Sequence, residues 1–473
     1  MLPLRWYWIW YPPLALRLCS RISPGPSGTA PWCWRRGVAV TILLMLMLLP
    51  QHSLWAAPSE IHVLQEPVVD HDAPPETRLR VAPFLRFGAE VKVEGIGATN
   101  LDLDATTTDD QAFVTPEMAL AVLFEPSPSF TAFLNVEVGQ DITLTGPDES
   151  PQRLQVVLKE AFVALADVLK SGIDLRMGRQ KFDDAREWLF DAELDAVRVG
   201  YRWSALTLEG AVSRRDLAPR ELFHAEAREE RTYYLLMGRY AVTTAHTVAA
   251  YGLLRDDRSP PQDQSLFLGV HAHGTVREAV AYWVEFAHVC GREGPRTLRG
   301  YGVDLGMTSR VPLPWQPALT VGVAFGSGDT DPAGRVDRSF RQTGLHDNEG
   351  TWAGVAKFKY YGELLDPELS NLLILTGAIG LRPTRTSSLD LVAHAYLQHT
   401  AAAQLRDTRL DMAPLGHSRT LGRALELIVG YEPGREVKAR WILSLFVPGS
   451  AFPADADPAF FTKVEVEYRL GHR

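Results

Sequence analysis

The segment from Arg176 to Trp203 gathers side chains that bind anions into a short part of the chain. It reads RMGRQKFDDAREWLFDAELDAVRVGYRW, so arginines and aspartates recur within a few residues of one another. Guanidinium groups offer forked donors to carboxylates and sugar hydroxyls, while nearby aspartates orient the arginines and keep an anion from binding too tightly. These residue types suggest anion binding with easy release, provided that the flanking elements hold them on one surface.

Alternating segments flank these charges on both sides. Residues 173–177 and 197–203 place apolar side chains at every second position, which is the period of a β-strand. The opposite, polar face of the two predicted strands carries Asp174, Arg176, Gln180, Arg198 and Arg202. Arg179 has the parity of the apolar face, but its place at a strand end would let it turn toward the polar side. The connecting loop adds Asp183, Asp184, Arg186, Asp191 and Asp195.

The same alternation recurs along the whole chain. Residues 78–94, RLRVAPFLRFGAEVKVE, alternate over a length that exceeds the five or six residues usual for a strand of a soluble sandwich. Similar segments follow as far as the C-terminus, and we expect about eighteen strands in all, each of about ten residues. Aromatic residues fall near predicted strand ends, where interfacial girdles are expected: Tyr201, Trp203, Tyr360, Tyr361, Trp441, Phe460 and Phe461.

The connections between these segments alternate between tight turns and long loops. Tight turns at Pro126, Ser204 and Thr243, for example, interleave with long loops such as 290–298 and 327–369. This layout predicts an all-β fold, a transmembrane antiparallel β-barrel with short periplasmic turns and long extracellular loops. Closure leaves no unpaired edge in lipid, and about eighteen strands enclose an aqueous channel. The alternative, a secreted protein of several sandwiches, would not alternate its loop lengths so regularly.

The N-terminus has the layout of a secretory signal. Arg35 and Arg36 precede the apolar run 38–49, which is too short for a transmembrane helix and is followed by small residues near Ala56 and Ala57. We therefore predict a signal peptide with a long N-terminal extension (1–57), a periplasmic lead segment (58–77) and an outer-membrane barrel (78–473).

Composition excludes several other classes of protein. The formal net charge is −9, and loss of residues 1–57, with five arginines and no acid, would make it −14, so we expect no nucleic-acid partner. Cys290 would be the one cysteine left, which excludes an internal disulfide. No catalytic or nucleotide-binding motif is present, and we expect neither an enzyme nor a cofactor.

Several segments together resemble the alginate export family of outer-membrane barrels. They are RMGRQ from Arg176, AREWLFDAELDAVRV from Ala185, VAFGSGDTD from Val323, FKYYGELLDPELSNLLI from Phe358 and AIGLRPTRTSSLDLVAHAYLQ from Ala378. Their order and spacing suit an eighteen-strand barrel, and the likeness extends from about Leu79 to Leu470.

The resemblance implies a monomeric passive channel with an arginine-lined constriction, gated by an extracellular loop and a periplasmic turn and supplied by periplasmic export proteins. Carried over by position, the pore-lining set is Arg176, Arg179, Gln180, Arg186, Asp191, Asp195 and Arg198. Asp329 and Asn371 match family positions without an assigned role. The last strand departs from the usual pattern, because Tyr468 and Leu470 stand where such barrels finish on an aromatic residue.

Two weaker patterns favour structure over chemistry. Residues 326–337 have spaced acids and glycines but lack the full calcium-loop pattern, so we expect an extracellular loop. His271 and His273 share a strand face without a third ligand, so we expect no metal site.

We predict export of an anionic, alginate-like polysaccharide across the outer membrane, with lipid around the barrel. The alternatives are a general or anion-selective uptake porin for small anions and a structural sleeve for a partner held in the lumen.

Overall fold

Eighteen long antiparallel strands form a closed barrel, as predicted. A computed structural model describes residues 76–107, 109–146, 153–223, 231–259, 262–277 and 279–470. The predicted signal peptide and nearly all of the predicted lead segment lie outside the described residues. None of the described helical segments is long and apolar enough to cross a membrane.

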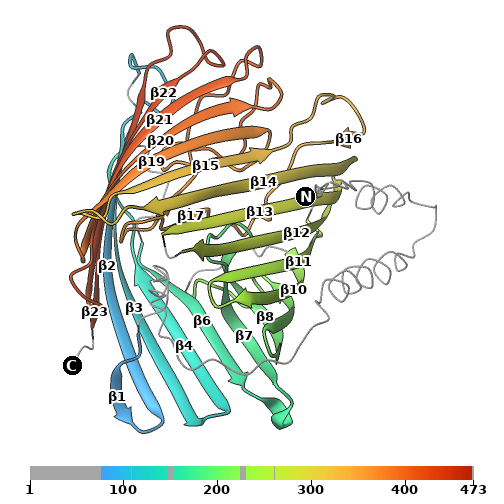
Figure 1. Ribbon diagram of the computed structural model, residues 1–473, viewed down its shortest axis with the longest axis vertical. Coiled ribbons are helices and arrows are strands. Elements are labelled where there is room, and N and C mark those ends of the chain that lie inside the picture. Colours follow the sequence, from blue (N-terminus) through green and yellow to red (C-terminus); the bar gives the residue numbers. More distant parts are fainter. Residues whose placement is uncertain are drawn as a thin grey trace, which may run out of the picture. The chain divides into compact units, whose positions relative to one another are not determined.

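The wall follows the chain order around the ring, from β2 to β23 (Figure 1). Its strands are β2 (Leu85–Thr99), β3 (Gln111–Ser127), β4 (Phe130–Gly139), β6 (Gln155–Leu165), β7 (Ile173–Asp183), β8 (Asp191–Trp203), β9 (Leu206–Arg214), β10 (Arg231–Thr243), β11 (His246–Asp257), β12 (Asp263–Val276), β13 (Val280–Glu293), β14 (Arg296–Arg310), β15 (Ala318–Gly326), β19 (Leu372–Thr384), β20 (Ser387–Gln398), β21 (Thr420–Tyr431), β22 (Val437–Pro448) and β23 (Ala459–Leu470). The first and last strands close the ring in register from Ala89 opposite Leu470 to Thr99 opposite Phe460.

Shorter elements lie at the ends of the wall or between its strands. β1 (Leu79–Ala82) pairs with β2, β5 (Ile142–Thr145) pairs with β3, and the 3₁₀ turn η1 (Val168–Lys170) joins β6 to β7. β16 (Val336–Asp337) runs parallel to the start of β14, and β17 (Glu349–Gly350) pairs with β18 (Phe358–Lys359) in a separate small sheet.

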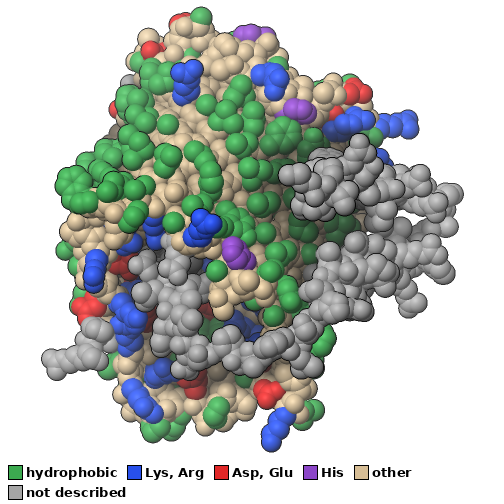
Figure 2. All heavy atoms as spheres, viewed as in Figure 1, with side chains coloured by type: hydrophobic (Ala, Val, Ile, Leu, Met, Phe, Trp, Pro, Cys, Tyr) green, Lys and Arg blue, Asp and Glu red, His purple; other side chains and the backbone are tan. Residues whose placement is uncertain are grey.

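Alternation along each strand gives the barrel an apolar outer surface. On β23 the outward residues Val464, Val466, Tyr468 and Leu470 are exposed, while Glu465 and Glu467 point inward and are buried. Figure 2 shows hydrophobic side chains gathered over much of the face in view. A belt of this kind suits a surface that is solvated by lipid.

The outward aromatic residues fit the girdle prediction only in part. Tyr201, Trp203, Trp441 and Phe460 are exposed on the outer face. Tyr360, Tyr361 and Phe461 are instead buried. Phe461 has the inward parity beside Phe460, and both tyrosines belong to a loop that enters the barrel.

Loop lengths agree with the predicted alternation except at two places. The predicted long loop 255–263 is shortened to residues 258–262, because β11 and β12 stay paired as far as Asp257 opposite Asp263. The predicted long loop 290–298 is only Gly294 and Pro295, because β13 and β14 stay paired from Val280 opposite Ser309 to Glu293 opposite Arg296. Its polar residues therefore belong to strand ends.

The longest loop, residues 327–371, folds into the lumen. It bonds inward-facing side chains around the ring: Tyr361 donates to Asp304 on β14 at 3.1 Å, and the amide of Glu363 donates to Glu426 on β21 at 2.8 Å. With the β7–β8 loop (184–190) and the β20–β21 loop (399–419), it builds a hydrophobic core inside the barrel. We call these three segments the constriction loops.

The β7–β8 hairpin leaves the wall at Gly178. β6 pairs with β7 only from Ala161 to Leu165, and beyond this point the β9–β10 loop pairs with β6 instead. The amide of Leu158 donates to the carbonyl of Arg220 at 2.9 Å. Gly178 has φ 121°, and a Cβ there would lie 2.3 Å from the carbonyl oxygen of Ala161, so only glycine fits. We call this place the β6–β7 seam.

Candidate functional site

Three arginines from neighbouring strands face the lumen on one side of the barrel. Arg176 on β7 and Arg198 on β8 are direct cross-strand partners. Arg239 on β10 shares their face, because it and Arg198 both contact Glu209 on β9. We call Arg176, Arg198 and Arg239 the basic wall patch.

Acidic groups neutralise this patch only in part. Glu209 accepts a hydrogen bond from Arg198 at 2.8 Å and lies 3.4 Å from Arg239. Arg176 forms no ion pair with a described residue, and its guanidinium lies 4.5 Å from the ring centre of Phe162. Glu160 and Asp183 also act electrostatically on Arg176 without an ion pair. Three cations with one ion-paired carboxylate can still attract an anion to this surface.

The basic wall patch borders the part of the lumen that the constriction loops leave open. The side chains of Arg198 and Arg239 are 20% and 31% exposed. Inward residues on the opposite wall, such as Ile428 and Ile442, are completely buried beneath the loops. The described lumen is therefore more accessible along β7 to β10 than on the opposite wall.

Arg186, predicted to line the pore, instead anchors the constriction loops. Its guanidinium lies between the rings of Trp283 and Tyr360, 4.3 and 4.0 Å from their centres, and pairs with Asp304 at 2.7 Å. Asp304 also accepts hydrogen bonds from the Trp283 indole at 2.8 Å and from Tyr361. Asp304 is thus a hub that ties two of the loops to β13 and β14.

Arg179 and Asp195 lie together on the outer face and close the β6–β7 seam. Arg179 holds Asp195 with two hydrogen bonds of 2.9 and 2.8 Å and donates to the carbonyls of Leu158, Ala218 and Pro219. It is 2% exposed. Because the hairpin bends inward beyond Gly178, Arg179 is enclosed by the β9–β10 loop and does not turn into the pore mouth.

The remaining predicted residues are dispersed. Gln180 faces inward but is fully buried, where it donates to the carbonyls of Gly178 and Ala196. Asp191 pairs with Lys181 at 2.9 Å beside a cavity at the extracellular end. Arg202 pairs with Asp174 at 2.9 Å at the periplasmic mouth.

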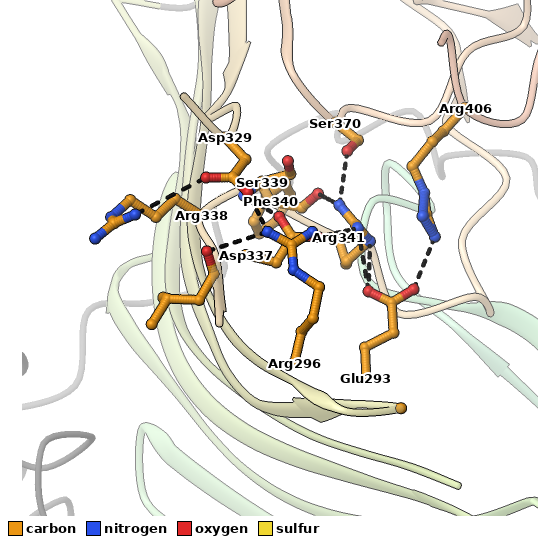
Figure 3. Close-up of polar contacts among 12 residues, drawn as sticks. Glu293, Arg296, Asp329, Asp337, Arg338, Ser339, Phe340, Arg341, Ser370 and Arg406 are labelled. Carbon is orange, nitrogen blue, oxygen red and sulfur yellow. Dashed lines mark hydrogen bonds and ion pairs between the residues drawn. The ribbon is translucent and has the colours of Figure 1, made fainter. Parts of the chain in front are cut away.

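An ion-pair network fixes the outer rim near the start of the longest loop (Figure 3). Arg341 pairs with Asp337 at 2.9 Å and with Glu293 at 3.1 Å, and Arg406 joins Glu293 at 2.9 Å. Asp329 pairs with Arg296. Asp329 and Asp337, two acids of residues 326–337, therefore hold arginines, as expected of a structural loop.

Asn371 joins the longest loop to the β20–β21 loop near the end of β15. Its side-chain amide donates to the carbonyl of Thr400 at 2.8 Å, and its side-chain oxygen accepts the amide of Thr400 at 2.8 Å. Asn371 therefore has a structural place at the rim.

Two cavities flank His346 and Asp347 in the longest loop. One has a volume of about 380 Å³ and is bordered by Lys159, Lys181 and Arg215, and the other, of about 180 Å³, is bordered by Lys359 and Arg409. Burial, with Lys359 and Arg255 nearby, lowers the pKa of His346 to about 3.

Glu187, Asp347 and Glu349 are the group among the described residues whose oxygens lie close enough to hold a metal ion. Lys357 occupies the same place, in ion pairs with Glu187 and Glu349. Burial raises the pKa of Glu187 to about 9, against the opposing effect of Lys357. The Lys357 ammonium group therefore already balances negative charge at the place where a metal ion would bind.

Comparison with known proteins agrees with this architecture. The sequence profile described as alginate export matches residues 84–461, which span almost the whole barrel. The chain belongs to the alginate export family. It is an outer-membrane channel protein, since both this family and the closed barrel are of that kind. No curated protein matches the chain in sequence.

Solved structures share the fold of this alginate export family member at low identity. Pseudomonas aeruginosa OccK11 (OpdR) has a TM-score of 0.53 and 12% identity, with 84% of this chain and 98% of that chain covered. P. aeruginosa OccK5 (OpdH) has a TM-score of 0.54 and 10% identity, with 81% and 98% covered. P. aeruginosa OpdK, solved with vanillate, has a TM-score of 0.52 and 9% identity, with 81% and 98% covered.

Sequence reasoning missed two residues of the site in this alginate export family barrel. Arg239 lies in an alternating strand whose outward residue Leu236 fixes the parity, so alternation could have found it. Asp304 could not have been found in this way, because its role depends on Arg186 and Tyr361, which are distant in sequence.

Proposed function

We propose that the chain carries an anionic, alginate-like exopolysaccharide passively outward through the lumen, along the basic wall patch. The observation that supports this best is the cross-strand pair Arg176 and Arg198, two cations side by side. Arg198 pairs with Glu209, whereas Arg176 forms no ion pair with a described residue, although Glu160 and Asp183 lie close enough to act on it. A wall that attracts polyanions on its solvated side is what such a substrate requires.

The arrangement suits passage better than tight capture. Arg176 and Arg198 can each offer a forked pair of donors to a uronate carboxylate. Because Arg239 and Glu209 continue the surface on the next strands, a carboxylate that leaves one arginine meets another donor or a competing acid. Conduction needs attraction that is weak enough at each site for release.

Small-anion uptake is the second candidate, and the constriction loops favour it. They narrow the lumen, and the fold is shared with OpdK, whose structure contains vanillate. A sleeve for a partner protein fits less well, because the chain's own loops occupy much of the interior. We propose that the channel works as a monomer that receives its polymer from periplasmic export proteins.

Ion selectivity and blockade in planar bilayers test the proposal. We expect anion-selective reversal potentials and blockade by oligouronates but not by neutral oligosaccharides of equal length. The double variant Arg176→Gln, Arg198→Gln should weaken blockade by about a hundredfold, since each of the two charge-assisted contacts contributes about 1.5 kcal/mol. Arg258→Gln, an exposed residue on the extracellular side, is the matched control.

Two results would contradict export. Cation selectivity that the double variant leaves unchanged would remove the role of the basic wall patch. Flux of small carboxylates without any blockade by oligouronates would favour uptake instead.

A further inference from the structure

A second group of arginines lies on the outside of the barrel at its extracellular end. Arg292 on β13 is opposite Thr297 on β14, and Arg299 follows two residues later on the same face. Arg338 directly follows β16, whose Val336 is opposite Thr297, so that it continues this face on the next strand. The three arginines thus lie on β13, on β14 and directly after β16, which are adjacent in the sheet.

Alternation shows that this face points away from the lumen. Tyr301, Leu305 and Met307 have the parity of Arg299 on β14 and are 46%, 45% and 49% exposed. Leu298 and Asp337 have the opposite parity and are buried. Figure 3 shows Arg338 directed away from the rim network that holds Arg341 and Arg406.

The height of Arg299 matches the outer boundary of the apolar belt. From Arg299 to Arg310, the last residue of β14, the strand rises about 36 Å, because each residue adds about 3.3 Å. A tilt of about 45° reduces this to about 25 Å along the membrane normal, which is the height of the apolar band of such barrels. Arg310 therefore lies near the inner boundary and Arg299 near the outer one.

Positive charge is in excess on this face. At and beyond the level of Tyr301, the other described outward positions of β12, β13, β14 and β16 are Gln264, Leu266, Leu268, Thr297 and Val336, together with His288 and Cys290, and none is a carboxylate. Asp329 lies 3.9 Å from Arg338 and also pairs with Arg296, so it compensates Arg338 only in part. Arg292 and Arg338 are both exposed.

We propose that Arg292, Arg299 and Arg338 bind the phosphate groups of lipopolysaccharide in the outer leaflet, with Tyr301 and the apolar side chains below them against its acyl chains. Guanidinium forks match phosphate oxygens, and basic side chains at a membrane boundary attract anionic head groups. This site lies on the opposite side of the wall from the basic wall patch, so it is independent of what the channel transports.

Binding of purified lipid A to the full barrel in detergent tests this proposal. Native mass spectrometry and thermal unfolding would compare bis-phosphorylated lipid A, dephosphorylated lipid A and inorganic phosphate. We expect the phosphorylated lipid to bind and to raise the melting temperature. In the triple variant Arg292→Gln, Arg299→Gln, Arg338→Gln its affinity should fall by at least about tenfold. Arg310→Gln, on the same β14 but at the inner boundary, should bind as the wild type does.

Each alternative outcome is decisive. Equal binding of phosphorylated lipid A to the wild type and the triple variant would overturn the proposal, as would equal binding of the dephosphorylated lipid to the wild type. If inorganic phosphate bound as tightly as the lipid and depended on the same arginines, the site would serve free phosphate. The single variant Arg338→Gln, at an arginine whose side chain is 56% exposed, keeps the test valid if the triple variant fails to fold. Anion selectivity should be the same in the triple variant and in Arg338→Gln as in the wild type, because all three arginines face away from the lumen.

Discussion

Replacing Asp304 by alanine should release the constriction loops. Its carboxylate accepts hydrogen bonds from Arg186 at 2.7 Å, from the Trp283 indole at 2.8 Å and from Tyr361 at 3.1 Å, and Asp304 is 2% exposed. The change leaves a buried guanidinium without its counter-charge, which costs about 3–5 kcal/mol. Asp304→Asn keeps an acceptor oxygen and loses only the charge, so we expect a smaller loss of about 2 kcal/mol.

Single-channel conductance is the direct assay, because the loops narrow the lumen. We expect conductance to rise in the order wild type, Asp304→Asn, Asp304→Ala, together with faster hydrogen exchange of residues 184–190. The backbone pairing of the eighteen strands does not involve this carboxylate, so the barrel itself should remain folded. In a double-mutant cycle, Arg186→Ala and Asp304→Ala should couple strongly, since each removes the other's partner.

Asp174→Asn is the matched control, because Asp174 lies at the periplasmic mouth and contacts Arg202 rather than a constriction loop. If Asp304→Ala showed wild-type conductance and wild-type exchange in residues 184–190, Asp304 would not be the hub that holds these loops. An equal rise in the Asp174→Asn channel would point to a general effect of charge instead.

Further predictions concern the β6–β7 seam and the pH response. Gly178→Ala should lower the stability of the barrel by about 1–3 kcal/mol in thermal unfolding because of its positive φ, whereas Gly377→Ala, with open space around it, should not. Arg179→Lys should raise proteolysis of the β9–β10 loop, since a lysine cannot reproduce the fork. Because its pKa is lowered to about 3, His346 stabilises the fold above about pH 6.5, and this contribution is lost as pH falls toward 3. His346→Gln should remove that part of the acid-induced loss of thermal stability. The pKa of Glu187 is raised to about 9, so its contribution to stability is full below about pH 4.5 and is lost as pH rises toward 9, and Glu187→Gln should flatten thermal stability over that window.

Alternation predicted the wall well because it is a local signal. The period of two along β7 and β8 placed Arg176 and Arg198 on the inward face, and the structure agrees. Residues 290–298 show where the signal ends. The polar side chains at this rim, among them Arg292, resemble a loop, yet β13 and β14 continue through them above the apolar belt.

The interior could not be predicted, because it depends on contacts between distant parts of the chain. Arg186 has the charge expected of a pore-lining residue. It is an anchor only because Trp283, Tyr360 and Asp304 surround it in the folded barrel. Arg179 is similar, since its partners Ala218 and Pro219 lie about forty residues further along. Nothing in the sequence around Arg179 or Arg186 indicates these distant partners.

The β6–β7 seam also sets an order of assembly. β6 and β7 are consecutive in the chain, but the extracellular half of β6 obtains its partner from residues that follow β9. A nascent barrel that already holds β2 to β8 therefore still has an open edge in its wall. That edge stays unpaired until the β9–β10 loop arrives. A chain truncated before Ala218 should therefore leave the extracellular half of β6 without a hydrogen-bonding partner, although its periplasmic half is paired with β7.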